Sequence, residues 1–249
     1  MRKKLLLVAA AVLVSMSTQA QQLYNMGFDT WSKEGGVWYP YAKEASDSKK
    51  VWDSANKGLS LLGVNTTVPE YTHTVVEGKA AAKVMSRKVL WAFVAGNLFT
   101  GRFNKVVELS GADMDFGVPF TGRPKSLSGY VHYLPKLINH VQKPYQHLKG
   151  KPDVGRIEVI LTDWDGRKHI DTTKDPFVDG DKDPHVIGRA VLDLEGETDG
   201  YIPFEITFQY RNGKTPKYAF IFVTPSRYGA SFTGGSGSTI YVDEFRFNY

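Results

Sequence analysis

The chain has no cysteine among its 249 residues. This absence excludes disulfides, thiolate metal sites and a cysteine nucleophile. The sequence also lacks the HExxH pattern of zinc peptidases and the GxSxG turn of serine hydrolases, and no GK[ST] follows GGSGS at 234–238, so that stretch is a flexible loop rather than a phosphate-binding loop. The fold must therefore be stabilised by its apolar core, and none of these catalytic motifs identifies an activity.

Long apolar runs are equally scarce, and the one that is present lies at the N-terminus. A cationic MRKK start precedes about ten apolar residues, and STQA ends the stretch at Ala20. This pattern predicts a secretory signal peptide over residues 1–20, too short to span a bilayer. No second such run follows, so we expect a soluble, exported protein without a membrane span, located in the periplasm, outside the cell or at the cell surface.

The sequence has little net charge once this leader is set aside. The whole chain has 31 Lys and Arg against 26 Asp and Glu, and three of the cations lie in the leader, which leaves 28 against 26. A nearly balanced surface gives no support for a nucleic-acid partner. No shift in composition marks a linker, so we expect a single domain over residues 21–249.

Long amphipathic helices are absent too, and short apolar segments alternate with Gly, Pro, Asn and Asp. Longer polar stretches at 136–153 and 165–184 are expected to be loops. The predicted strands are 80–84, 89–95, 106–109, 127–133, 156–162, 204–210, 218–224 and 239–247. Short strands in this number predict an all-β chain folded as a β-sandwich or jelly roll.

Several segments together resemble a known family. They are GFDTW at 27–31, VWDSAN at 51–56, AGNLFTGRF at 95–103, GVPFTGRPKSLSGYVHY at 117–133, ILTDW at 160–164, PFEITFQY at 203–210 and SRYGASFTGGSGSTIYVDEFRF at 226–247. In these motifs the chain is similar to the putative carbohydrate metabolism domain of exported bacterial proteins, over essentially the whole mature length. The resemblance implies a galactose-binding-like jelly roll and a role with glycans, without supplying a catalytic mechanism.

Aromatic residues are the first candidates for sugar recognition, which uses flat ring faces and planar polar groups. Trp52 and Trp164 lie in polar company, in VWDSAN and TDWDG. Each is interpreted equally well as a solvent-facing platform or as a packed residue. Trp91 lies in the apolar run VLWAFVA and is expected in the core.

The tripeptide FTG occurs three times, at 99–101, 120–122 and 232–234, with flanks that do not align. An aromatic and a β-branched residue followed by glycine favour a strand exit, so shared turn chemistry explains the copies better than a structural repeat. Arg102 and Arg123 follow two of them, and we expect these side chains at strand ends, binding adjacent hydroxyls or a uronate, or fixing a loop. Two asparagines could bind sugar hydroxyls through similar paired hydrogen bonds. The carbohydrate-binding candidates are therefore Trp52, Asn56, Asn97, Arg102, Arg123 and Trp164.

A structural Ca²⁺ ion is a further hypothesis. Many jelly-roll sugar-binding modules hold such an ion between the first and last strands, and by this resemblance Asp29 and Asp243 would be its ligands. DGDKD at 179–183 begins like an EF-hand loop but has Pro184 where Gly is required and Ala190 where Glu is required. We interpret that stretch as a solvated acidic loop, and we expect no other cofactor.

Three hypotheses for function remain. The leading one is an exported carbohydrate-recognition protein whose partner is an oligo- or polysaccharide. The alternative is a glycoside hydrolase or lyase that uses a pair of carboxylates on the same scaffold, although sequence spacing selects no pair. The third is a structural or adhesive envelope component without sugar specificity. Whether the protein is an enzyme stays open, and we favour binding without catalysis.

Overall fold

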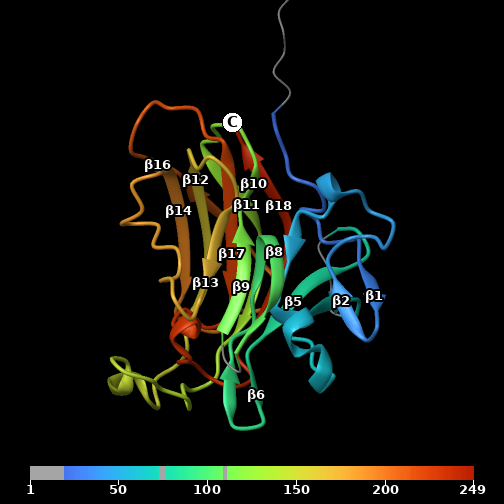
Figure 1. Ribbon diagram of the computed structural model, residues 1–249, viewed down its shortest axis with the longest axis vertical. Helices are drawn as coiled ribbons and strands as arrows, with labels where there is room; N and C mark the ends of the chain where they lie inside the picture. The colour runs from blue at the N-terminus through green and yellow to red at the C-terminus, as the bar shows by residue number, and fades with distance from the viewer. Residues whose placement is uncertain (1–19, 73–76, 109–110) are drawn as a thin grey trace, which may run out of the picture.

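The computed structural model describes residues 20–72, 77–108 and 111–249 (Figure 1). The signal peptide predicted over residues 1–20 lies, except for Ala20, outside the described residues and stays a prediction. Within the described ranges the regular secondary structure consists of strands and short 3₁₀ helices, joined by loops. No helix in that part of the chain is both long and apolar enough to cross a membrane.

Antiparallel strands of the described ranges pair into two large sheets and two hairpins. The larger sheet runs β13–β9–β8–β17–β12–β14–β16, with β3 paired to β8 and β10 to β17. Its strands are β3 (Trp52–Asp53), β8 (Leu98–Val107), β9 (Gly111–Phe116), β10 (Val118–Pro119), β12 (Gly155–Thr162), β13 (Lys168–Asp171), β14 (Val186–Leu194), β16 (Gln209–Tyr210) and β17 (Tyr218–Thr224).

The smaller sheet runs β15–β11–β18–β5–β4. Its strands are β4 (Thr67–Glu70), β5 (Ala81–Met85), β11 (Ser126–Leu134), β15 (Ile202–Thr207) and β18 (Thr239–Asn248). The hairpins pair β1 (Ser32–Glu34) with β2 (Val37–Tyr39) and β6 (Arg87–Val89) with β7 (Ala92–Val94). The 3₁₀ helices are η1 (Asp47–Lys49), η2 (Ala55–Leu62), η3 (Gln146–Leu148) and η4 (Gly229–Ser231).

The main core lies between the two large sheets. Alternate residues of β12 (Ile157, Val159 and Leu161) face alternate residues of the other sheet, such as Leu127 and Val131 of β11. All five are buried to 1% exposure or less. This period-two pattern follows from the alternation of side chains along a strand. The predicted all-β fold with two sheets packed as a β-sandwich is confirmed.

A second apolar cluster covers part of the outward face of the larger sheet. Phe116, Ile160 and Phe220 are buried there, and Phe177 from the segment between β13 and β14 packs against them. This segment belongs to the loop predicted at 165–184, which also contains the unpredicted strand β13. The outward face therefore has an apolar half under this segment and a polar half beside it.

Two sequence interpretations are wrong for local reasons. The FTG at 99–101 lies inside β8 and does not end a strand. Gly101 has φ +150°, and a Cβ there would lie 2.2 Å from the carbonyl oxygen of Asp115 on β9, so this glycine permits close strand approach. Trp91, expected in the core, is 83% exposed at the tip of the β6–β7 hairpin, because the apolar run that contains it is split by a two-residue turn.

Candidate functional site

Both candidate tryptophans are packed residues. Trp52 is 0% exposed, contacts Phe28 edge-on in the main core, and donates its indole N–H to the carbonyl oxygen of Tyr24 at 3.0 Å. Trp164 is 4% exposed in the second apolar cluster and donates to Asp183 Oδ2 at 3.1 Å. Of the two alternatives open from the sequence, both tryptophans are packed residues rather than solvent-facing platforms, and neither presents a ring face to a ligand.

The two candidate arginines fix loops. Arg102 lies within β8, and its guanidinium donates to the carbonyl oxygens of Lys50, of Gly101 and, at 3.0 Å, of Asp47. Arg123 donates to the carbonyl oxygens of Lys214 and, at 3.1 Å, of Asn212, and stacks on the Tyr210 ring at 4.1 Å. These contacts match the loop-fixing alternative for both residues, and the two arginines hold different loops.

The candidate asparagines organise the backbone around η2. Asn56 is 1% exposed; its Oδ1 accepts from the backbone N–H groups of Thr66 and Thr67, and its Nδ2 donates to the carbonyl oxygen of Trp38. Asn97 Oδ1 accepts from the backbone N–H of Ala55 at 3.0 Å. The six carbohydrate-binding candidates thus do not form one site, although Asn56 and Asn97 both serve the η2 region.

The two predicted calcium ligands lie in different settings. Asp29 is exposed and accepts from the backbone N–H groups of Lys79 and, at 3.1 Å, of Ala80. Asp243 is 0% exposed, and its Oδ1 accepts from the N–H of Glu244 at 2.8 Å. Across the described ranges, no three His, Cys, Asp or Glu side chains gather in a way that could hold a metal ion. The calcium ion stays a prediction.

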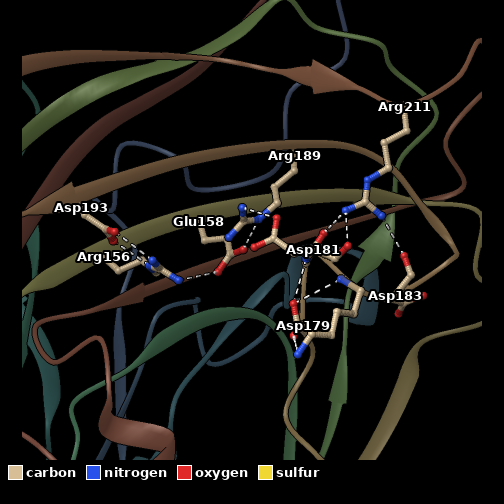
Figure 2. A network of polar contacts seen from close by, with 10 residues as sticks. Arg156, Glu158, Asp179, Asp181, Asp183, Arg189, Asp193 and Arg211 are labelled. Atoms are coloured by element: carbon tan, nitrogen blue, oxygen red, sulfur yellow. Dashed lines mark hydrogen bonds and ion pairs between the residues drawn. The ribbon is translucent and has the colours of Figure 1, made fainter. Parts of the chain in front are cut away.

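An alternating row of arginines and carboxylates occupies the polar half of the larger sheet's outward face (Figure 2). Arg156 and Asp193 lie opposite each other on β12 and β14, and the Arg156 fork donates to both Asp193 oxygens at 2.7 and 2.9 Å. Arg156 Nη1 is also 3.8 Å from Glu158 Oε2. Glu158 Oε1 accepts from Arg189 Nε at 2.6 Å. The hydrogen bond to Asp193 is the main reason the pKa of Arg156 is raised.

The row continues at both ends through residues outside the strands. Arg227 Nη1 lies 2.9 Å from Asp193 Oδ2, and Arg189 Nη1 donates to Asp181 Oδ1 at 2.9 Å. Between them the side chains of Glu158 and Arg189 are only 12% and 22% exposed. Partial burial strengthens such pairs relative to surface ion pairs, because water screens them less.

The acidic loop predicted to be solvated is held against this row. Arg211 donates to the carbonyl oxygens of Gly180, Asp181 and Asp183 at 2.6, 2.8 and 3.0 Å (Figure 2). Asp179 Oδ1 accepts from the backbone N–H of Asp181, the main reason its pKa is lowered. The loop is thus held in place, because Arg211 binds three of its carbonyl oxygens and Arg189 binds the Asp181 carboxylate.

Aromatic side chains complete a pocket of about 310 Å³ around the row. Tyr145 and Tyr228 lie with ring centroids 4.7 Å apart, and Phe177 lines the pocket beside the acidic loop. We call this hollow the ion-pair pocket; its lining includes Arg156, Glu158, Arg189, Asp181, Arg227, Tyr145, Tyr228 and Phe177. It presents paired donors and acceptors on a flat strand surface next to aromatic rings.

A second, larger hollow of about 940 Å³ crosses β11, β15 and β18 of the smaller sheet. Tyr130, Glu205, Arg246 and Glu244 contribute to its lining. Burial raises the pKa of Glu244, and the nearby carboxylates of Glu77 and Asp29 raise it further. This hollow therefore combines several carboxyl groups with an aromatic ring.

Sequence reasoning missed the ion-pair pocket even though one of its signals was visible. Arg156 and Glu158 alternate with apolar residues at the start of the predicted strand 156–162, which puts both on one face. Their partners Arg189 and Asp193 lie on β14, which was not predicted as a strand. The pairing of β12 with β14 brings the four together, and no local pattern encodes that pairing.

Comparisons with known proteins point to carbohydrate metabolism and to one fold. A family model described as "Putative carbohydrate metabolism domain" matches residues 27–248. A structure of a putative glycoside hydrolase from Bacteroides thetaiotaomicron aligns with a TM-score of 0.66 and 22% identity, covering 93% of this chain and 72% of that one. Another, from Bacteroides vulgatus, aligns with a TM-score of 0.64 and 20% identity, covering 88% and 94%. At these identities the likeness shows the fold. No curated protein matches the chain.

Proposed function

The chain belongs to the putative carbohydrate metabolism domain family, and on this premise we propose that it recognises an oligo- or polysaccharide through the ion-pair pocket. The observation that carries the proposal is the alternating row of guanidinium and carboxylate groups beside two tyrosine rings. Adjacent sugar hydroxyls each donate and accept, so they match a surface on which donors and acceptors alternate. The apolar face of a sugar ring packs on an aromatic ring.

The charge balance of the pocket favours a neutral sugar over a uronate. Each of Arg156, Arg189 and Arg227 already faces a carboxylate within 3.0 Å. A ligand carboxylate would have to compete with these internal partners, whereas hydroxyl groups can add to the lone pairs and N–H groups that remain. Both carboxylates of the central row are committed to guanidinium donors, which suits binding better than proton transfer.

Isothermal titration calorimetry against a panel of neutral and acidic oligosaccharides tests the proposal. Tyr228→Ala removes one of the two tyrosine rings and its contact with Arg227, whose guanidinium lies 5.4 Å from the ring centroid, but leaves the Arg156–Glu158–Arg189 ion pairs in place. We expect it to weaken binding of the best neutral ligand about tenfold. Tyr71→Ala is the matched control, because Tyr71 is 57% exposed and does not line the pocket. Absence of binding by folded protein across the panel, or equal loss in both variants, would contradict the proposal.

Glycoside hydrolysis in the larger hollow is the second candidate function. The raised pKa of Glu244 favours it, because a general acid must carry a proton when it meets the substrate. Glu205, which lines the same hollow, would act as the second carboxylate. Release of reducing sugar that disappears in Glu244→Gln and in Glu205→Gln, but persists in Glu158→Gln, would support hydrolysis at this hollow.

Export to the periplasm, the cell surface or beyond is part of the proposal and rests on the N-terminal sequence pattern. The fold uses the residues directly after the predicted cleavage site. Gln21 Oε1 accepts from the backbone N–H groups of Thr121 and Gly122, and Gln22 exchanges two hydrogen bonds with the backbone of Phe247. Mass spectrometry of the exported protein should find Gln21 as its first residue, and an uncleaved N-terminus would contradict this.

A further inference from the structure

The tip of the β6–β7 hairpin exposes two large apolar side chains side by side. Val89 pairs with Ala92, which leaves Leu90 and Trp91 as a two-residue turn. Leu90 is 64% exposed and Trp91 is 83% exposed. Leu90 also has φ +54°, a left-handed conformation that glycine adopts without steric penalty and leucine does not. Because both side chains are exposed and Leu90 adopts an unfavourable backbone conformation, this tip does not contribute to the stability of the fold.

The base of the hairpin is firmly held, so the tip projects from a defined place. Phe93 is 3% exposed and stacks on His140 with ring centroids 5.4 Å apart. Ser86, just before β6, accepts from the backbone N–H of Gly96 and shares a 2.8 Å hydrogen bond with Ser226. Figure 1 shows the hairpin projecting beyond the lower end of the sandwich.

Three segments meet at this end of the molecule: the hairpin 87–94, the segment 135–152 and the segment 226–238. His140 pairs with Gly234, and Gln142 N–H donates to Thr233 Oγ1 at 2.9 Å. We call these three segments together the basic end. Besides the hairpin tip, the basic end exposes Leu137 (60%) and Phe232 (43%).

The basic end has cations and no acidic residue in its sequence. Its Lys and Arg residues are Arg87, Lys88, Lys136, Lys143, Lys149, Lys151 and Arg227, and none of its three segments contains Asp or Glu. Asp153, which directly follows the second segment and binds residues of the third, is 0% exposed and adds no acidic group to the surface. Of these cations, Arg227 is engaged with Asp193 in the ion-pair pocket, and the other six are exposed. Residues 21–249 have nearly equal numbers of cationic and acidic side chains. The gathering of cations at the basic end therefore makes this end positive, and the acidic side chains that balance it lie elsewhere on the molecule.

We propose that the basic end docks on an anionic lipid surface, with Leu90 and Trp91 entering the headgroup region and the surrounding lysines and arginines facing lipid phosphates. An indole beside an aliphatic side chain is the combination that partitions into a membrane interface. Clustered cations add attraction to anionic lipids. A polyanionic polysaccharide would use the cations but would leave Leu90 without a role, so a lipid surface accounts for more of the tip. The proposal does not depend on saccharide binding.

Vesicle flotation of the purified protein tests this docking. We expect binding to vesicles of phosphatidylethanolamine with phosphatidylglycerol, little binding to phosphatidylcholine alone, and a loss of binding as salt rises. A blue shift of tryptophan fluorescence should accompany binding. The double variant Leu90→Gly with Trp91→Ser should lower the partition coefficient at least about tenfold. Because glycine is favoured at the first position of such a turn, this variant is expected to fold.

Two further variants separate the contribution of the cations to vesicle binding from that of the apolar tip. Lys88→Glu with Lys143→Glu should abolish the preference for anionic vesicles and leave the turn intact. Leu61→Ser is the matched control for the tip, because Leu61 is 99% exposed on η2 and belongs to none of the three segments of the basic end, so it should leave vesicle binding unchanged.

Three results would overturn the proposal. One is equal binding of the wild type to anionic and neutral vesicles, or to neither. Another is vesicle binding by the Leu90→Gly, Trp91→Ser variant that equals the wild type. The last is tight, salt-sensitive binding to dextran sulfate without vesicle binding, which would assign the basic end to a polyanionic polysaccharide.

Discussion

Replacing Glu158 with Gln removes the central charge of the ion-pair pocket while keeping nearly the same shape. Glu158 Oε1 accepts from Arg189 Nε at 2.6 Å, and Oε2 lies 3.8 Å from Arg156 Nη1. The Gln amide keeps one acceptor for Arg189 and turns an NH₂ group toward Arg156. Two partly buried guanidinium groups then face a neutral side chain.

The size of the expected loss in stability depends on the ion pairs that remain after the substitution. Removing one partner of a fully buried pair costs about 3–5 kcal/mol. Here Arg156 keeps Asp193 and Arg189 keeps Asp181, and the Glu158 side chain is 12% exposed. We therefore expect the free energy of unfolding to fall by about 1–2 kcal/mol. If the pocket binds saccharide, affinity should also fall, since an acceptor pair is lost.

Urea unfolding followed by circular dichroism measures the change, and a double-mutant cycle with Arg189→Met isolates the pair. We expect a coupling free energy of about 1 kcal/mol or more between the two positions. Lys174→Met is the control, because Lys174 pairs with Asp171 at 3.1 Å but is 76% exposed, so its loss should be within about 0.5 kcal/mol. Additive effects of Glu158→Gln and Arg189→Met would refute the reasoning.

Two further predictions concern buried carboxyl groups. Burial raises the pKa of Asp53 to about 6 against 3.8 for an unperturbed Asp, so as pH falls the folded protein takes up this proton before the unfolded chain does. The free energy of unfolding should therefore rise by up to about 3 kcal/mol between pH 7 and about pH 4, relative to Asp53→Asn. Parallel pH profiles of the two proteins would contradict this. Asp153 Oδ2 accepts from Ser226 Oγ, the Gly235 N–H and Ser238 Oγ at 2.6, 2.7 and 3.0 Å. Asp153→Asn should therefore lower stability by about 2–3 kcal/mol in calorimetry, and an unchanged melting temperature would count against that network.

Part of the fold was predictable because it depends on local alternation. The segments 127–133, 156–162 and 218–224 all lie within observed strands: the first alternates because it has one buried face, and the more continuously apolar runs of the other two are typical of central strands. By contrast, 89–95 was predicted as one strand and is a hairpin. Its turn, Leu90–Trp91, contains none of the residues that normally mark a turn.

The site residues were harder to predict because a residue's neighbours in sequence do not fix its burial. Trp52 has Asp53, Ser54 and Asn56 beside it, and this polar company left a solvent-facing platform and a packed residue equally open. All three polar side chains are themselves buried, and backbone groups distant in sequence satisfy Asp53 and Asn56. Polar residues can be internal when such partners exist, and the sequence does not display them.

The sequence by itself determined the fold class, the family and the fact that Arg156 and Glu158 share one face of a strand, because these depend on composition, motifs and the two-residue period of a strand. Only the tertiary structure decided which strands lie next to each other. That arrangement places Asp193 opposite Arg156 and Arg189 beside Glu158, and it folds the acidic loop onto them. Ion pairs act over a few ångströms, so a charge network that spans separate strands exists only once the sheet has formed.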